Sequence, residues 1–204
     1  MPDIIASSEE LSKEKVIILG VKVKSLRKVK ITWQAVKSDS TYQIYRSKKK
    51  KTGYKLVQTI NAKTSWTDKK LKKGKKYFYK ICLCRENCLD GIQETFSDVK
   101  KVKMPWYIAP KVKYTKEKLS DGTKCLKVRL KKYKGTDIQI FTRKKDKSFQ
   151  KLSLNYSKIK KYNGVFRLTY TQKKQKMYLK VRTYQKVKGK KRYSMYTPVK
   201  KVRL

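Results

Sequence analysis

Three cysteines near the middle of the 204-residue chain come closest to a pattern that could do chemistry. Cys82, Cys84 and Cys88 follow the spacing C-x-C-x3-C, which offers three potential thiolate ligands. A tetrahedral zinc site needs a fourth ligand, but the chain has no histidine and its other cysteine, Cys125, is distant in sequence. On an extended segment Cys82 and Cys84 share the outward face about 7 Å apart, which is long for a disulfide. We predict that these cysteines remain thiols and bind neither metal nor cofactor, with a zinc site as the alternative.

Catalytic groups of other kinds are sparse. The absence of histidine excludes Ser/His and Cys/His nucleophile pairs. Asp90, Glu94 and Asp98 lie along one segment, where neighbouring lysines would neutralise paired carboxylates. No glycine-rich phosphate loop is present. We therefore predict that the protein is not an enzyme and has no catalytic residues.

Positive charge is the dominant property of the chain. Lysine and arginine number 58 against 14 acids, which gives a formal net charge of +44. Such a surface attracts polyanions of any class. The densest runs supply the candidate polyanion contacts, which are Lys48, Lys49, Lys50, Lys51, Lys72, Lys73, Lys75 and Lys76. Lysine lacks the planar fork of arginine, which disfavours specific base or phosphate recognition. The alternative is that these lysines solvate strand edges and protect them from pairing.

The elements that would position these residues are β-strands. Val29, Ile31, Trp33 and Ala35 alternate with polar residues, which is the period of a strand with one buried face. Similar short segments recur about every ten residues, with turn signals between them. We predict an all-β fold of two tandem antiparallel β-sandwiches.

A repeat sets the number of domains. Residues 77–104 align without a gap on residues 177–204, with Lys80/Lys180 and Val102/Val202 identical and Phe96/Tyr196 similar. Each copy is predicted to be a terminal hairpin, the first one turning at Asp90-Gly91. Val99 and Val102 differ in parity, so a β-bulge is predicted around Lys100-Lys101 and at the same place in the second copy.

The domain organisation follows from this spacing. We predict a flexible leader at residues 1–15, a domain at 16–104, a proline-containing linker at 105–110 and a divergent domain at 111–204. Between Ser148 and Gly164 the two copies correspond poorly, so an enlarged loop or extra strand is expected there. No stretch approaches about 18 apolar residues, and the first 15 residues do not resemble a secretion signal.

Four motifs of the first domain occur in a characteristic order: Ile31-Thr-Trp33, Tyr42-Gln-Ile-Tyr-Arg46, Thr64-Ser-Trp-Thr-Asp68 and the run from Leu71 through Gly74 and Tyr77 to Ile81. Together they resemble a bacterial fibronectin type III domain. The resemblance implies a seven-stranded sandwich in which Trp33, Gly74 and Tyr77 are structural residues, with Tyr77 forming a corner hydrogen bond. The second copy diverges, since Leu130, Lys174 and Met177 replace the tryptophan, glycine and tyrosine.

The function implied by this resemblance is structural. We expect a monomeric spacer or adhesion module pair on a bacterial surface or secreted protein, located outside the cell or at its surface. Its partners would be anionic cell-wall polymer or host glycan, and nucleic acid only non-specifically. The alternative is a dedicated protein that binds nucleic acid or anionic glycan.

Overall fold

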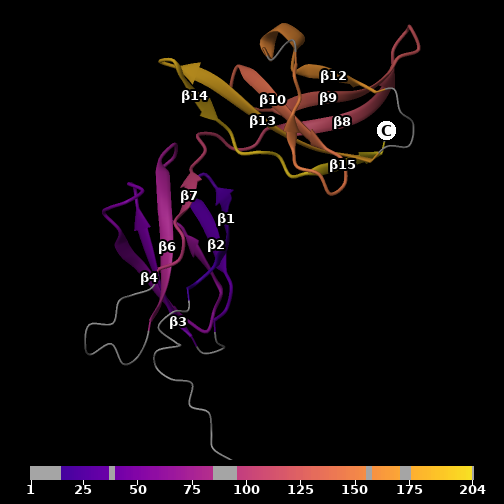
Figure 1. Ribbon diagram of the computed structural model, residues 1–204. Helices are drawn as coiled ribbons and strands as arrows, with labels where there is room; N and C mark the ends of the chain where they lie inside the picture. Colours follow the sequence, from indigo (N-terminus) through magenta and orange to yellow (C-terminus); the bar gives the residue numbers. More distant parts are fainter. Residues whose placement is uncertain (1–14, 37–39, 85–95, 155–157, 171–175, 204) are drawn as a thin grey trace, which may run out of the picture. The chain divides into compact units, whose positions relative to one another are not determined.

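The computed structural model describes residues 15–36, 40–84, 96–154, 158–170 and 176–203, which form an all-β chain (Figure 1). Every pair of neighbouring strands in the sheets is antiparallel, which confirms the predicted fold class. The chain divides into two compact units, Met1–Met104 and Pro105–Leu204. In the described part of the chain, no helix is long and apolar enough to cross a membrane.

Unit 1 is a sandwich of a three-stranded and a four-stranded sheet. The first has the order β1-β2-β5, with β1 Ile18–Ser25, β2 Lys28–Trp33 and β5 Ser65–Asp68. The second has the order β4-β3-β6-β7, with β4 Lys55–Asn61, β3 Thr41–Ser47, β6 Lys76–Cys84 and β7 Lys100–Lys103. Ile31 and Trp33 of β2 share one buried cluster with Ile44 of β3 and Ile81 of β6, so both sheets face the same core. Seven strands in two antiparallel sheets agree with the fibronectin type III-like sandwich inferred from the motifs.

The core strand β2 ends one alternation earlier than predicted. Val29, Ile31 and Trp33 are buried, but Ala35 is exposed and lies beyond the end of the strand. The backbone N–H of Gln34 donates to the carbonyl of Ile17 at 2.9 Å. The small, weakly hydrophobic side chain of Ala35 gains little from burial, so the predicted inward position is wrong.

Unit 2 has two sheets of its own. One has the order β12-β9-β8, with β8 Lys111–Lys118, β9 Lys124–Lys132 and β12 Val165–Thr169. The other follows β11-β10-β13-β14, with β15 also paired to β13; the bounds are β10 Asp137–Arg143, β11 Gln150–Lys151, β13 Lys176–Val187, β14 Lys190–Tyr193 and β15 Lys200–Arg203. Val128, Ile140 and Val181 belong to one buried cluster drawn from both sheets.

The segment in which the two copies correspond poorly forms short structures. It contains the two-residue strand β11 and a 3-10 helix, Lys160–Tyr162. Residues that follow Pro105 hydrogen-bond to the β14 region, since Trp106 N–H donates to the carbonyl of Tyr193 at 2.8 Å. The domain boundaries predicted at residues 16, 105 and 111 remain predictions.

The bulge predicted at Lys100-Lys101 is wrong as placed. Lys100 and Lys101 pair in regular register with Tyr79 and Phe78, and the second copy is equally regular over β15. The irregularity lies upstream, because Cys82 pairs with Phe96 whereas Tyr79 pairs with Lys100. Between these two pairs the chain advances three residues along β6 but four residues from Phe96 to Lys100, so the extra residue of a bulge lies before Lys100. The parity conflict disappears because Val99 is exposed whereas Val102 is buried.

Cys82 alternates with the core residue Ile81 and so lies on the outward face as predicted, but it is covered and does not reach the solvent. It is only 1% exposed, and its Sγ lies 3.9 Å from Oε1 of Gln43. Its neighbours across the sheet are Gln43 and Phe96, which are large enough to cover a small thiol on an outer face. The side chain of Cys84, residue Cys88 and the Asp90-Gly91 turn lie outside the described residues. Whether these cysteines stay as thiols or bind zinc therefore remains a prediction.

Candidate functional site

Two lysine-rich loops of unit 1 line one open hollow of about 470 Å³. One loop connects β3 to β4, and the other connects β5 to β6. The cationic residues of the lining are Arg46, Lys48, Lys49, Lys55, Lys70 and Lys72, and Tyr77 lies among them. We call this set the cationic hollow.

The first loop is held by hydrogen bonds of its own. The buried Ser47 donates from Oγ to the carbonyl of Thr52 at 2.6 Å and accepts the N–H of Lys49 at 2.9 Å. The hydroxyl of Tyr54 donates to the carbonyl of Lys50 at 2.8 Å. These contacts fix the backbone that carries Lys48 and Lys49, so part of the entropic cost of ordering these lysines is already met.

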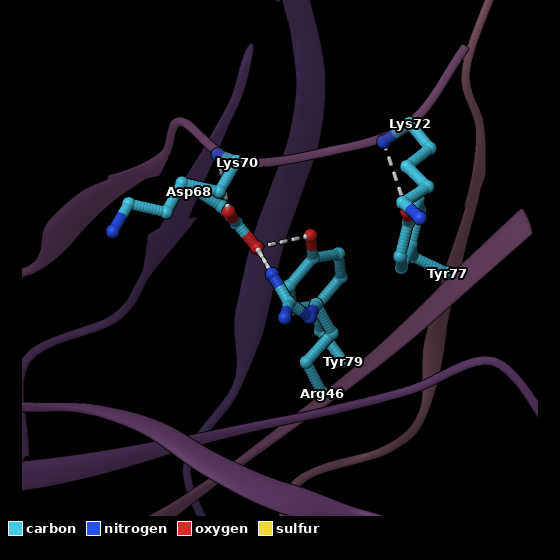
Figure 2. A network of polar contacts seen from close by, with 6 residues as sticks. All are labelled: Arg46, Asp68, Lys70, Lys72, Tyr77 and Tyr79. Atoms are coloured by element: carbon cyan, nitrogen blue, oxygen red, sulfur yellow. Dashed lines mark hydrogen bonds and ion pairs between the residues drawn. The ribbon is translucent and has the colours of Figure 1, made fainter. Parts of the chain in front are cut away.

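The second loop is fixed by a tyrosine corner (Figure 2). The backbone N–H of Lys72 donates to the hydroxyl oxygen of Tyr77 at 2.9 Å, and the neighbouring Leu71 is fully buried in the core. Gly74 turns the chain with φ of 70°, a region that favours glycine. The corner thereby sets the path of the backbone from Lys70 to Lys72 beside the first loop.

A buried carboxylate ties the hollow to the core. Asp68 is 2% exposed, and its Oδ2 lies 2.7 Å from Nη1 of Arg46 and accepts the hydroxyl of Tyr79 at 2.9 Å (Figure 2). Its Oδ1 accepts the N–H of Lys70 at 3.3 Å. Burial, together with the adjacent Asp68 charge, raises the pKa of Tyr79 far above its usual range, so the phenol remains a donor. Asp68 therefore neutralises Arg46, and the charge of the hollow comes from its lysines.

Counter-ions for those lysines are absent from the described part of unit 1. Its described acids are Asp68 and Asp98, and these pair with Arg46 and Lys15. No described ion pair therefore neutralises the five lysines that line the hollow, which are Lys48, Lys49, Lys55, Lys70 and Lys72. Crowded like charges repel one another, and an anionic group placed among them would relieve that repulsion.

The hollow overlaps the lysines selected from the sequence without matching them. Lys48, Lys49 and Lys72 line it. The other five candidates are exposed but lie outside the lining; they are Lys50, Lys51, Lys73, Lys75 and Lys76. Lys70 is an additional member from the second loop, close in sequence to the predicted contact Lys72. Arg46 and Lys55 are further members, which face each other across the β3-β4 ladder. The hairpin register is the signal that could have identified them, since it pairs residues on either side of the Lys48–Lys51 turn.

The remaining structural candidate, Trp33, and the divergent corner residue of unit 2, Met177, both lie at the cores of their units. Trp33 is buried in the core, where its ring makes an edge contact with Tyr42 at a centroid distance of 5.5 Å. Met177 occupies the position in unit 2 that corresponds to Tyr77, and it packs against the core of that unit. A thioether carries no hydroxyl that could accept the corner N–H. Lys174 lies outside the described residues.

No protein-family model and no curated protein matches the chain. Among solved structures, a human fibronectin type III domain solved in solution is similar, with 20% identity and a TM-score of 0.38, over 48% of this chain and 82% of that domain.

Proposed function

We propose that the chain is a non-catalytic structural, spacer or adhesion module pair of a bacterial surface or secreted protein that contacts anionic polymers through the cationic hollow. The fibronectin type III-like sandwich of unit 1 supports a scaffold role, although fold alone does not fix function. The observation that carries the proposal is the convergence of Lys48, Lys49, Lys55, Lys70 and Lys72 in one hollow, where no described ion pair neutralises them.

The lysines of the hollow would select a ligand by its density of negative charge and not by its shape. Lysine ammonium groups are compact point charges without the fork that reads planar anions. A volume of about 470 Å³ accommodates a group the size of one anionic sugar or phosphate, but it is too small for a nucleic-acid duplex. Cell-wall polymer or host glycan is therefore the proposed partner, and nucleic acid would bind only non-specifically. The second candidate, a dedicated polyanion-binding protein, is favoured by the net charge of +44.

The test removes charge from the hollow and, separately, from elsewhere in unit 1. A Lys48→Gln/Lys49→Gln/Lys72→Gln variant is compared with a Lys22→Gln/Lys24→Gln/Lys100→Gln control, whose lysines are exposed and lie outside the hollow lining. Each variant lowers the formal charge equally, from +44 by 3 to +41. Affinity for wall polymer, sulfated glycan and polyglutamate of equal charge is measured at about 150 mM salt, where exposed charges are screened beyond about 8 Å.

The hollow variant is expected to lose about tenfold in affinity, because three screened ionic contacts together contribute about 1.4 kcal/mol. The control should change little. Equal losses in the two variants would show that general surface charge is responsible and would reject the hollow. Binding that distinguishes the polymers supports a surface module with a chosen partner, whereas tight and uniform binding favours the second candidate.

A further inference from the structure

The outward face of the β10-β13 ladder in unit 2 carries cations in successive rows. Ile140, Leu179 and Val181 point into the core, so the residues that alternate with them lie on the other face. The ladder places Arg143 beside Tyr178, Phe141 beside Lys180 and Gln139 beside Arg182. Successive rows are two residues apart, or about 7 Å, so three cations span about 14 Å of one strand pair.

Aromatic rings hold each of these cations. Cζ of Arg143 lies 4.6 Å from the ring centre of Tyr178, and Nζ of Lys180 lies 4.1 Å from that of Phe149. Cζ of Arg182 lies 3.9 Å from the ring centre of Tyr193, and its Nε donates to Oε1 of Gln139 at 2.8 Å. Tyr196 lies between the last two cations, 4.7 Å from each. We call this set the cation–aromatic strip: Arg143, Lys180 and Arg182 with Phe141, Phe149, Tyr178, Tyr193 and Tyr196.

The strip is short of negative charge. The ion pairs of the described residues in unit 2 use Lys127, Lys145, Lys158 and Arg167, and none uses a cation of the strip. Burial and then the charges of Arg182 and Arg143 lower the pKa of Lys180. Three half-buried cations are therefore crowded together, with aromatic rings in place of described carboxylates.

Unit 1 shows that this charge is not required by the scaffold. The same rows of its β3-β6 ladder hold Ser47 beside Phe78, Tyr45 beside Lys80 and Gln43 beside Cys82. Lys80 has the aromatic contacts of Lys180, but Ser47 and Cys82 stand where unit 2 has Arg143 and Arg182. The two arginines are additions specific to unit 2.

We propose that the cation–aromatic strip is a second anion-binding site, separate from the cationic hollow, that binds one phosphodiester chain along the β10-β13 ladder. Cation–π contacts hold the three charges in place, so binding costs less side-chain entropy than at mobile surface lysines. Guanidinium forks match the oxygens of phosphate and can donate two hydrogen bonds to them. The rows present one cation at a time, which suits a single linear chain rather than a compact anion.

The experiment measures binding of the full chain to two labelled phosphodiester probes of about 12 repeats, an oligothymidylate and an abasic oligomer of equal length. The test variant is Arg143→Gln/Arg182→Gln. The control is Arg129→Gln/Lys131→Gln, which removes two exposed charges from β9 in the other sheet of unit 2. Association constants are measured by fluorescence anisotropy from about 100 to 300 mM salt.

The strip variant should reduce the slope of log K against log salt by about 1.4, since each lost phosphate contact on a single strand contributes about 0.7. The control should leave the slope close to that of the wild type. Arg143→Gln alone should remove about 0.7, which tests the site even if the loss of the half-buried Arg182 impairs folding. Arg182→Lys should keep the slope and lose affinity, because the charge remains and the fork does not.

The two probes distinguish the sources of the phosphodiester. Equal binding indicates a base-free polymer, and binding of the oligothymidylate alone indicates single-stranded nucleic acid, whose bases stack on aromatic side chains. Equal effects of the strip variant and its control would overturn the proposal. So would a polyglutamate of equal charge that binds as tightly and is weakened as much by the strip variant. The Lys48→Gln/Lys49→Gln/Lys72→Gln variant should leave the strip effect intact, so the two sites can fail separately.

Discussion

The two units share a lysine enclosed by aromatic rings on the outer face of the larger sheet. In unit 1, Nζ of Lys80 lies 3.1 Å from the ring centre of Phe96, and in unit 2 Nζ of Lys180 lies 4.7 Å from that of Tyr196. The edge-to-face ring pairs behind these contacts also match; they are Tyr45–Phe96 at 5.3 Å and Phe141–Tyr196 at 5.4 Å. The outer face of this sheet is therefore part of the shared scaffold.

In both units a side-chain hydroxyl also accepts the backbone N–H of the residue that follows this lysine. Ser97 Oγ accepts the N–H of Ile81 at 2.9 Å, and Thr197 Oγ1 accepts the N–H of Val181 at 2.9 Å. In return, the N–H groups of Ser97 and Thr197 donate to the carbonyls of Ile81 and Val181. The side chain satisfies an amide that the irregular last strand leaves without its regular backbone partner.

Beyond these shared features the units have different polar chemistry. Unit 1 anchors its lysine-lined hollow with Asp68 and the Tyr77 corner, whereas unit 2 has Met177 at the corner position and two added arginines on its sheet face. The strands and the enclosed lysine are therefore common to both units, whereas each charged site belongs to one unit. Each unit should therefore respond to a different set of substitutions.

The largest expected loss of folding stability comes from removing the buried carboxylate of unit 1, compared with removing an exposed carboxylate of the same unit. Asp68→Ala leaves Arg46 and the hydroxyl of Tyr79 without their partner and should cost about 3 kcal/mol. That value is at the low end for a buried pair, because the Arg46 side chain is 29% exposed. Hydrogen exchange should show the loss in unit 1 and leave unit 2 protected. Asp98→Ala is the control, since that carboxylate is 77% exposed and its ion pair in the described part of unit 1 is with Lys15. Comparable losses from both variants would contradict the buried network.

The corner position also distinguishes the two units, because Tyr77 forms a hydrogen bond there. Tyr77→Phe removes the oxygen that accepts the N–H of Lys72 and should destabilise unit 1 by about 1.5 kcal/mol. Met177→Leu at the corresponding position removes no hydrogen bond and should cost less than about 1 kcal/mol. Denaturant unfolding, with hydrogen exchange to assign each loss to a unit, makes the measurement. Equal losses would mean that packing, and not the corner bond, stabilises both positions.

Sequence periodicity was sufficient for the fold but not for its irregularities. The alternation of Val29, Ile31 and Trp33 predicts β2 and its buried face correctly. Alternation also predicts an inward Ala35 and a bulge at Lys100-Lys101, and both predictions are wrong. Both errors arise where a strand leaves its ladder, a point set by long-range hydrogen bonds such as that from Gln34 to Ile17.

The sites were less predictable because they depend on contacts between distant segments. The density of lysine predicts which loops line the hollow. That Arg46 and Lys55 also line it follows from the strand register that pairs these two residues. The cation–aromatic strip has a local trace, since Lys180 and Arg182 alternate along β13. Of its five rings, Tyr178 lies on β13 itself. The other four come from β10, from the segment before β11, from β14 and from the region after β14, and nothing local to Lys180 reveals them. The 100-residue offset identified Lys80 and Lys180 as equivalent without showing why lysine recurs there.

The smallest expected effect is a pH dependence that belongs to unit 2. Because the pKa of Lys180 is lowered, the unfolded chain holds more protons at this residue than the folded one as pH rises from neutrality toward 10.5. Folding stability should therefore increase over that range, and Lys180→Gln should remove the increase, which is under about 1 kcal/mol for a half-exposed group. Lys186→Gln, an exposed neighbour on β13, is the matched control.

Denaturant unfolding at pH 7.5 and 9.5 would measure the change in the free energy of unfolding for the wild type and both variants. The upper pH is kept below 10. Burial raises the pKa of Tyr196, so above pH 10 the unfolded chain loses that proton first and stability falls again. Working below that point isolates the lysine, whose ammonium is desolvated among the rings and repelled by Arg143 and Arg182. If Lys180→Gln kept the wild-type slope between the two pH values, the three charges would not be coupled, and the contrast with the single enclosed lysine of unit 1 would lose its electrostatic basis.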